Sequence, residues 1–342
     1  GVQTLALQIP IGQGQDFEGV IDFLKMKELR WSADDEGETI IESEIDASRI
    51  DQANEWKEKL IDTVASSDDE LAEIYLEGGE ITVEQLKAAI RKATIQRIFV
   101  PFVMGSARHN QGVQPLIDAI IDYLPCPTDV PAAKGIKIKK DESEEIEVPC
   151  DATKMPLGLV FKIQYDREMG PLCYVRMYSG KLQAGTQIFN VNKKKRERVN
   201  RILRMHADKS EPMDSLQAGD IAVFIGLKLA QTGDTIGSEA FNVLLEQPTF
   251  PQPVISVALE PESMSEKDKM NETLEILSRE DPTFTSHEDA ETGQLIISGM
   301  GELHLDVLVT RMKDDFGVKC NVGAPQVTYR ESVGGTAQAS ED

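Results

Sequence analysis

The chain has 342 residues, of which 40% are hydrophobic and 6% aromatic, a composition that supports a globular protein with about two or three cores. It carries 59 Asp and Glu against 36 Lys and Arg, which gives a formal net charge of −23. This acidity excludes a DNA-binding module held mainly by phosphate contacts, because such modules usually carry net positive charge.

Over the first 124 residues, short apolar runs alternate with segments whose apolar residues recur at helical spacing. Short apolar runs bounded by glycines predict strands, and apolar residues at three- and four-residue spacing predict helices. Thr82 is a suitable N-cap, with Ile81 before it as the hydrophobic residue that packs on the first turns. We expect strands at 2–11, 17–24 and 99–104, one or two helices in 53–76, and one helix each in 83–98 and 113–124.

A domain boundary is predicted near residue 125, because Pro125, Pro127 and Pro131 interrupt the helical pattern there. The region that follows is rich in short apolar runs separated by glycine-containing turns. The clearest of these predicted strands are 159–163, 173–178 and 221–227. Short strands at this spacing predict a closed β-barrel over residues 125–250.

A second boundary is marked by Pro248, Pro251 and Pro253, beyond which the periodicity changes again. Alternating and helically spaced apolar residues then predict strand, helix, two strands, helix and strand. The predicted elements are 255–259, 267–277, 283–287, 295–298, 305–316 and 318–322. This β-α-β-β-α-β order is the ferredoxin-like arrangement, which we assign to residues 251–330. Residues 331–342 look like the truncated start of a next domain.

Several motifs resemble one known family. The last third contains IISGMGELHLD at 296–306 and PQVTYRE at 325–331, and the middle contains RMYSG at 176–180 and RMHA at 204–207. These motifs resemble the third and second domains of elongation factor G, a family of bacterial translational GTPases. Upstream, QIPIG at 8–12 and NEW at 54–56 resemble the insertion in its GTPase domain.

The resemblance implies an α+β multidomain chain. Residues 1–124 would form the C-terminal part of an α/β GTPase domain, including its insertion. Residues 125–250 would form the β-barrel of translation-factor type, and 251–330 the ferredoxin-like third domain.

Only one guanine-nucleotide motif is expected in the chain. Gly105-Ser106-Ala107 resembles the fifth such motif, so Ser106 and Ala107 are the expected remnant of the guanine loop. No GxxxxGK[ST] sequence occurs to cradle phosphates. Residues 34–37 match DxxG but lie in an acidic loop, and 192–195 begin like NKxD but lack its Asp. Gly1 therefore looks like a position inside the GTPase domain, after the NKxD motif, and we expect the chain alone to be inactive.

The family implies a parent protein that hydrolyses GTP on the ribosome and moves tRNA and mRNA during elongation. GTP or GDP with Mg²⁺ would bind to the parent, and we expect no cofactor, metal or catalytic residue in this chain. The expected partner is the ribosome, through its RNA and proteins, with the tRNA–mRNA complex engaged indirectly. We expect a monomer that binds neither DNA nor a membrane.

A basic cluster is the first candidate binding surface. Lys and Arg outnumber Asp and Glu by one over residues 125–250, whereas residues 1–124 and 251–342 sum to −13 and −11. A solvated strand face is the alternative explanation for such a charge run. The resemblance favours contact with ribosomal RNA through Lys193, Lys194, Lys195, Arg196, Arg198 and Arg201.

Two residues near the predicted helix 305–316 are further candidates. Histidine side chains suit acid–base catalysis, yet no acid, base or nucleophile surrounds His304 in sequence, so we expect a structural role at the start of the helix. The resemblance implies that His304 and Arg311 face the GTPase domain near the fusidic acid pocket.

The chain shows no sign of export or membrane insertion. It has no run of about 18 apolar residues, and residues 1–10 lack a basic signal-peptide region. The four cysteines form no CxxC pair, so neither a zinc site nor a disulfide framework is indicated. We expect a cytoplasmic protein.

Three alternatives to a translocase are weighed. A related GTPase for ribosome recycling or for tetracycline protection shares the architecture. A GTP-independent ribosome-binding scaffold would begin near Gly1, and a P-loop encoded upstream would eliminate it. An RNA-modifying enzyme finds no nucleophile or metal cluster to support it.

Overall fold

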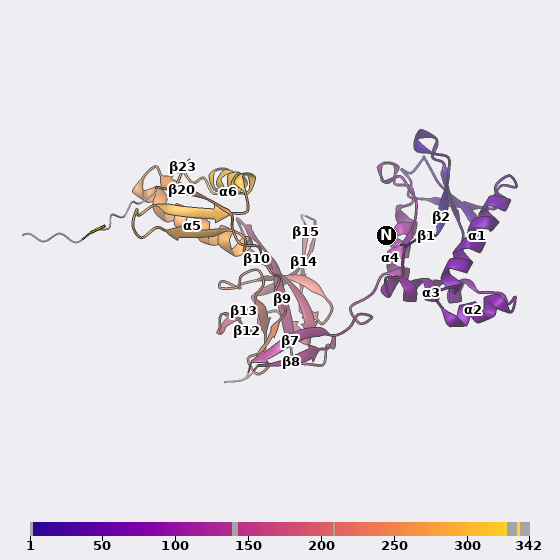
Figure 1. The fold of residues 1–342 in the computed structure, drawn as a ribbon, viewed down its shortest axis with the longest axis horizontal. Coiled ribbons are helices and arrows are strands. Elements are labelled where there is room, and N and C mark those ends of the chain that lie inside the picture. Colours follow the sequence, from indigo (N-terminus) through magenta and orange to yellow (C-terminus); the bar gives the residue numbers. More distant parts are fainter. Residues whose placement is uncertain (1–2, 139–142, 208, 327–333, 336–342) are drawn as a thin grey trace, which may run out of the picture. The chain divides into compact units, whose positions relative to one another are not determined.

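The computed structural model describes residues 3–138, 143–207, 209–326 and 334–335. The chain divides into two compact units that meet between Val130 and Pro131. Figure 1 labels the elements of both units along the chain.

The first unit combines two small sheets with four helices. β1 (Gln3–Ala6) pairs in parallel with β6 (Phe99–Phe102). A separate antiparallel sheet has the order β2-β3-β4-β5. Its strands are β2 (Gln8–Ile11), β3 (Gly19–Asp22), β4 (Lys27–Trp31) and β5 (Ile40–Ser43). The helices are α1 (Ile50–Ala65), α2 (Asp69–Leu76), α3 (Val83–Ile95) and α4 (Val113–Tyr123).

The strand predicted over residues 2–11 is interrupted at Leu7. The Leu7 N–H donates to the Phe102 carbonyl at 3.1 Å, whereas the Leu7 carbonyl accepts from the Phe23 N–H at 3.2 Å. Leu7 therefore bonds to both sheets, and the chain passes from one sheet to the other at this residue. A single apolar run in the sequence does not reveal that change of partner.

Local signals place the helices of the first unit. Asp68 accepts a hydrogen bond from the Leu71 N–H at 3.2 Å and starts α2, which divides the predicted 53–76 segment into two helices. Thr82 and Gln85 form a capping box, since each side chain accepts from the other residue's backbone N–H, at 3.2 and 3.0 Å. The predicted start of α3 is confirmed.

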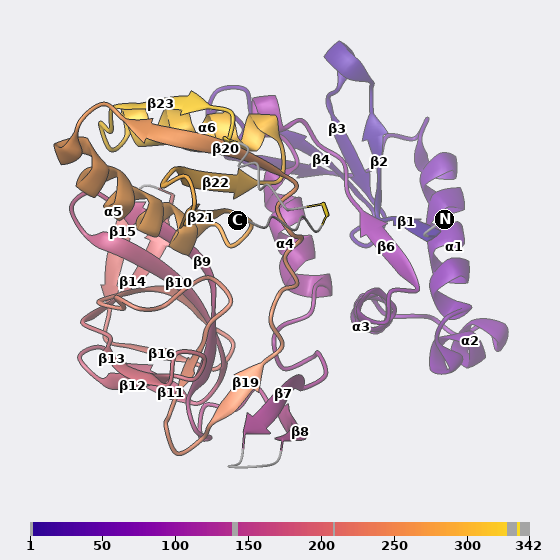
Figure 2. The ribbon, with the colours of Figure 1, turned by 60° about the vertical axis from the view of Figure 1, so that its left-hand side comes forward.

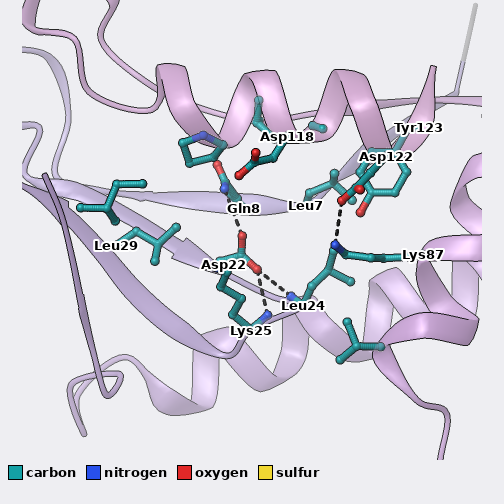
Figure 3. A pocket seen from close by; sticks show the side chains of 15 residues that line it. Leu7, Gln8, Asp22, Leu24, Lys25, Leu29, Lys87, Asp118, Asp122 and Tyr123 are labelled. Carbon is teal, nitrogen blue, oxygen red and sulfur yellow. Dashed lines mark hydrogen bonds and ion pairs between the residues drawn. The ribbon is translucent and has the colours of Figure 1, made fainter. Parts of the chain in front are cut away.

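A cavity of about 160 Å³ lies in the first unit and is lined by β2, β3 and α4 among others (Figure 3). Gln8 donates to Asp22 Oδ2 at 3.2 Å, and the Lys87 Nζ donates to Asp122 Oδ2 at 2.7 Å. Burial raises the pKa of Tyr123, which lines the same cavity. Most charges around this cavity are therefore held by neighbours within the fold.

The second unit begins with a β-barrel. Its main sheet has the strand order β13-β12-β18-β9-β10-β17-β14-β15. Two smaller sheets have the orders β11-β16 and β19-β7-β8. The main strands are β9 (Leu157–Asp166), β10 (Gly170–Ser179), β12 (Gln187–Asn190), β13 (Lys195–Arg198), β14 (Arg201–His206), β15 (Lys209–Met213), β17 (Ile221–Ile225) and β18 (Thr235–Gly237). The shorter strands are β7 (Ala133–Ile138), β8 (Ser143–Val148), β11 (Lys181–Gln183), β16 (Ser215–Gln217) and β19 (Val243–Leu245).

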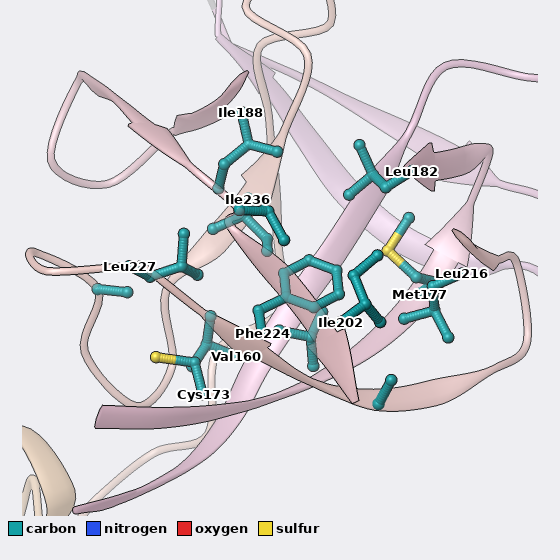
Figure 4. Close-up of a cluster of buried hydrophobic side chains, with 14 of the residues drawn as sticks. Val160, Cys173, Met177, Leu182, Ile188, Ile202, Leu216, Phe224, Leu227 and Ile236 are labelled. Carbon is teal, nitrogen blue, oxygen red and sulfur yellow. The ribbon is translucent and has the colours of Figure 1, made fainter. Parts of the chain in front are cut away.

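The barrel has a continuous apolar core (Figure 4). Phe224 and Met177 are fully buried at its centre and share it with side chains from opposite walls. Other members of this core are Val160, Cys173, Val175, Leu182, Ile188, Ile202, Leu216, Leu227 and Ile236. The strands predicted at 159–163 and 173–178 are confirmed within β9 and β10. The strand predicted at 221–227 corresponds to β17 but ends two residues earlier, at Ile225, because Gly226 has a φ of 112°.

The last elements form a ferredoxin-like sandwich. In chain order they are β20 (Ile255–Pro261), α5 (Met264–Glu280), β21 (Thr285–Glu288), β22 (Leu295–Gly299), α6 (Glu302–Asp314) and β23 (Cys320–Gly323). The sheet order is β21-β22-β20-β23, and all its pairs are antiparallel. Buried side chains of α5 and α6 share one core with the sheet, which confirms the predicted β-α-β-β-α-β fold. Figure 2 shows the two helices together with the four strands.

Candidate functional site

The predicted guanine-loop remnant forms a closed turn between β6 and α4. The Ser106 N–H donates to the Gln111 carbonyl at 2.8 Å, and the Gln111 N–H donates back to the Ser106 carbonyl at 3.1 Å. Ala107 begins a short 3₁₀ helix, Ala107–His109. Among the described residues, no backbone hydrogen bond of the turn uses the Ala107 N–H. Ala107 therefore retains a donor for an external acceptor, whereas the Ser106 N–H is already bonded.

Two glycines allow this turn to close. A Cβ on Gly105 would lie 2.5 Å from the Gln111 carbonyl oxygen, and one on Gly112 would lie 2.6 Å from the Met104 carbonyl oxygen. Gly112 also has a φ of +84°, in the left-handed region that favours glycine. The loop is thus held against the start of α4 by a backbone contact that leaves no room for side chains.

The predicted RNA-binding residues lie on one hairpin of the barrel and the strand after it. Lys193 and Lys194 occupy the turn between β12 and β13, where Lys194 has a φ of 54°. The six residues, which are Lys193, Lys194, Lys195, Arg196, Arg198 and Arg201, are all exposed. β13 forms one end of the main sheet, so its outward side chains project from an edge. The structure therefore leaves all six predicted residues exposed, five of them in the β12–β13 hairpin and Arg201 at the start of β14.

Two of these cations already have partners within the barrel. Arg196 Nε donates to Glu239 at 2.7 Å, and the Lys193 ammonium donates to Gln231. In the ranges that the structure covers, Lys194, Lys195, Arg198 and Arg201 have no acidic partner. Four unpaired charges remain on the surface, while Glu197 between them points inward and is 8% exposed.

His304 and Arg311 both lie on α6 and both contact the C-terminal end of α5. His304 Nε2 lies 2.8 Å from Asp281 Oδ2, and Arg311 donates to Glu280 Oε2 at 2.9 Å. Burial opposes ionisation of Asp281, but hydrogen bonds from Thr283 and His304 outweigh it and lower the pKa of Asp281. Although burial works against it, the bonds to Glu280 and Asp315 raise the pKa of Arg311.

Sequence reasoning missed the acceptors of these two residues. Glu280 and Asp281 end α5, where negative charge is unfavourable because the helix dipole is negative at that terminus. Adjacent acidic residues at a helix C-terminus were therefore a usable signal for nearby cationic partners. The sequence did not reveal which cations these partners are, because Arg311 lies 31 residues from Glu280 along the chain.

The described ranges contain no group of three or more His, Cys, Asp or Glu side chains placed to hold a metal ion. None of the helices in the same ranges is long and apolar enough to cross a membrane. Residues 327–331 of the PQVTYRE motif, and almost all of the segment 331–342, lie outside the described residues.

Two family models match segments of the second unit. Residues 155–239 match the family model "Elongation factor G domain 2", and residues 250–324 match "Elongation Factor G, domain III". These matches cover the strands β9 to β18 and the whole ferredoxin-like sandwich.

Relatives match over nearly the whole chain. Elongation factor G 1 of Treponema denticola is 60% identical over 333 residues, which are 97% of this chain and 48% of that protein. Elongation factor G 2 of Treponema pallidum is 56% identical over 338 residues, which are 99% of this chain and 49% of that protein. The chain thus spans about half the length of these relatives.

A solved structure shares the fold. A crystal structure of a Thermus thermophilus protein has a TM-score of 0.74 and 25% sequence identity, and the match covers 95% of this chain and 45% of that one. The same family is indicated by both family models, by the two Treponema relatives and by the order of a barrel followed by a ferredoxin-like sandwich. This chain belongs to the elongation factor G family.

Proposed function

We propose that this chain is the central part of a GTP-dependent ribosomal translocase that moves tRNA and mRNA during elongation. The observation that carries the proposal is 60% identity to a protein named elongation factor G 1, over 97% of this chain. Names of this kind favour translocation over recycling, tetracycline protection or a GTP-independent scaffold. The domain boundaries that we propose are residues 124/125 and 250/251, with residues 1–124 belonging to the GTPase domain.

Nucleotide binding would belong to the larger protein. The turn at Gly105-Ser106-Ala107 fits one backbone contact to a guanine carbonyl oxygen, because the Ala107 N–H is available there. GTP with Mg²⁺ would supply the γ-phosphate whose hydrolytic release changes the placement of the domains, and GDP with Mg²⁺ would be the product left bound. Within this chain, Ser106 would hold the turn closed and Ala107 would contact the base.

An exposed apolar face supports the assignment of the first unit to a larger α/β domain. On α4, Ile117 is 52% and Ile121 70% exposed, and on the neighbouring β6, Val100 is 51% exposed. A parallel pair such as β1 and β6 is normally covered on both faces and joined by further strands. We infer that the remaining elements of the GTPase domain cover this face. Leu116 and Ile120 of the same helix are likewise 45% and 47% exposed.

Two measurements test the proposed function. Calorimetry should detect no GTP binding to this chain and clear binding to the full-length product. The full-length protein should also move tRNA–mRNA on ribosomes in a GTP-dependent assay. Full-length protein that binds GTP but only splits ribosomes, or only displaces tetracycline, would contradict the translocase proposal.

The exposed face has its own test. The change Ile121→Lys should prevent the chain from associating with a separately expressed N-terminal half of the GTPase domain. Leu76→Lys is the matched control, because Leu76 is 85% exposed on α2 rather than on this face. Equal association of both variants would rule out α4 as the covered surface.

A further inference from the structure

The C-terminal end of α5 contacts the barrel and α6 through three consecutive side chains. Arg279 donates from Nε to the Ala230 carbonyl at 3.1 Å and from its terminal nitrogen to the Leu227 carbonyl at 3.2 Å. Glu280 and Asp281 accept from other elements. We call residues 279–281 the α5 joint. In both views of the ribbon the end of α5 lies beside the barrel (Figures 1 and 2).

Glu280 is the residue shared between the two domains. Its Oε1 accepts from the Tyr165 N–H of β9 at 2.5 Å, and its Oε2 accepts from Arg311 of α6 at 2.9 Å. The Glu280 side chain is only 9% exposed. Because a buried charge is costly without partners, loss of either donor would leave the carboxylate poorly compensated. The carboxylate therefore ties the position of β9 to that of α6.

The barrel presents a well-bonded loop to Arg279. The Leu229 N–H donates to Glu197 Oε1 at 2.7 Å, and the Gly233 N–H donates to the Val160 carbonyl at 2.7 Å. Thr232 Oγ1 lies 3.3 Å from the carbonyl oxygens of both Arg279 and Glu280, which the helix end leaves without helical partners. The loop thus donates to the helix end and accepts from its arginine.

The charge of Arg279 complements the barrel side of this contact. Glu197 and Asp234 are buried carboxylates, 8% and 5% exposed, and Glu197 Oε2 has no hydrogen-bond partner within the described chain. Burial raises the pKa of Cys173 to about 12, and Arg279 acts against that rise whereas Glu197 and Asp234 add to it. The guanidinium therefore lies within electrostatic range of the same barrel interior as the two carboxylates.

We propose that the α5 joint is a conformational lock that fixes the ferredoxin-like domain on the barrel, with Glu280 as its central residue. Release of Glu280 from the Tyr165 N–H, the bond that crosses between the domains, frees the ferredoxin-like domain to reorient while both domains stay folded. The bond to Arg311 lies within the ferredoxin-like domain and holds the carboxylate in position for Tyr165. The lock uses only residues of the second unit, so it stands or falls independently of nucleotide binding. Its chemistry is a shared buried carboxylate, with no covalent step.

The conservative change Glu280→Gln distinguishes loss of the shared hydrogen bonds from loss of packing. A glutamine presents one carbonyl oxygen and one amide group, so it faces either the Tyr165 N–H or Arg311 with a donor against a donor. The side-chain volume is almost unchanged, so the core beneath it stays filled. Arg279→Ala is the second variant and removes the bonds to Leu227 and Ala230 instead.

Interdomain distances measured by electron–electron double resonance test the lock on the full chain. Spin labels are attached after Lys181→Cys on β11 and Glu272→Cys on α5, both exposed positions, with Cys126 and Cys150 changed to serine. The parent chain should give one narrow distance distribution. Glu280→Gln and Arg279→Ala should each widen it about twofold or shift its centre.

Two controls separate the joint from general surface effects. Glu275→Gln makes the same chemical change at an exposed position of α5. Arg167→Ala removes an exposed ion pair to Asp315 that also joins the two domains, at 3.7 Å. Both should leave the distribution narrow, because exposed pairs contribute little. Unchanged distributions in Glu280→Gln and Arg279→Ala, with hydrogen exchange showing both domains folded, overturn the lock. If Glu280→Gln fails to fold, Arg279→Ala alone decides.

Discussion

His304 contacts Asp281 through one ring nitrogen and the backbone through the other. Nε2 lies 2.8 Å from Asp281 Oδ2, while Nδ1 accepts from the Met300 N–H at 3.1 Å. An acceptor at Nδ1 requires the neutral tautomer with its proton on Nε2, which then donates to Asp281. The pair therefore connects the turn before α6 to the end of α5 without a charge on the histidine.

The Asp281 bonds predict a pH-dependent contribution to stability. The pKa of Asp281 is lowered in the folded chain, so the stabilisation is present above the unfolded value, near 3.8, and is lost as pH falls through the lower folded pKa. At pH 7, Asp281→Asn should destabilise the ferredoxin-like domain by about 1–3 kcal/mol, because it weakens hydrogen bonds to a charged group. Hydrogen exchange of β22 amides reports this.

Asp268→Asn serves as the control for that prediction, because Asp268 is exposed on the same helix. It should change the exchange of β22 by less than about 0.5 kcal/mol. The difference between Asp281→Asn and the parent should shrink as pH falls below about 4. A difference that stays constant down to pH 2 would contradict a role for the ionised carboxylate.

The capping box at the start of α3 gives a second prediction. Thr82→Ala removes the acceptor for the Gln85 N–H and should destabilise the first unit by about 1 kcal/mol. Both tryptophans, Trp31 and Trp56, lie in this unit, so their fluorescence follows its unfolding in urea.

The matched control for the cap is Thr63→Ala in α1. The Thr63 hydroxyl donates only to the Lys59 carbonyl within its own helix, at 2.7 Å. Alanine has the higher helix propensity, so this change should be neutral or slightly stabilising. Equal losses in the two variants would mean that the cap itself contributes nothing.

Local patterns made much of the second unit predictable. The stripe from Leu305 to Met312 is buried in the sandwich core, because residues at helical spacing share one face of α6. The turns at glycines likewise separated the barrel strands. In these segments the periodicity of the sequence and the burial in the fold agree.

Partners distant in sequence were not predictable. β4 and β5 escaped prediction because their sequences, KELRW and IIES, each contain only two apolar residues. Their strand structure is evident only from the pairing of β4 with β3 and of β5 with β4. The six predicted basic residues are exposed, and their contact with RNA stays a prediction, but the sequence did not reveal that Arg196 is paired with Glu239, 43 residues away. Neither the strand pairing nor this ion pair changes the spacing of apolar residues from which elements are predicted.

The glycine contact beside the guanine-loop remnant gives a third prediction. Gly112→Ala would place a Cβ 2.6 Å from the Met104 carbonyl oxygen at a φ of +84°, so the start of α4 must shift. Trp31 senses this movement, since its Nε1 donates to Gln114 of α4 at 3.0 Å. We expect a loss of about 3 kcal/mol or more in the unfolding of the first unit, because steric overlap adds to backbone strain.

Gly78→Ala isolates the backbone strain from the steric overlap. Gly78 has a φ of +71°, but no atom lies within 4 Å of a Cβ built there. It should therefore cost only about 1 kcal/mol, the strain of a left-handed alanine. Losses of the same size in Gly112→Ala and Gly78→Ala would refute the close approach that holds the turn.

The basic hairpin gives the last prediction. The charge reversals Lys194→Glu and Arg198→Glu should each weaken binding of the full-length protein to small ribosomal subunits, because both cations are exposed and lack an acidic partner in the described chain. Each lost phosphate contact should reduce the slope of log affinity against log salt by about 0.7–0.9. Arg196→Glu should reduce the slope less, since Arg196 is already bonded to Glu239.

Lys181→Glu, an exposed change on β11, controls for net charge and should leave the slope unchanged. Equal slopes for Lys194→Glu, Arg198→Glu and Lys181→Glu would show that the hairpin does not contact phosphates.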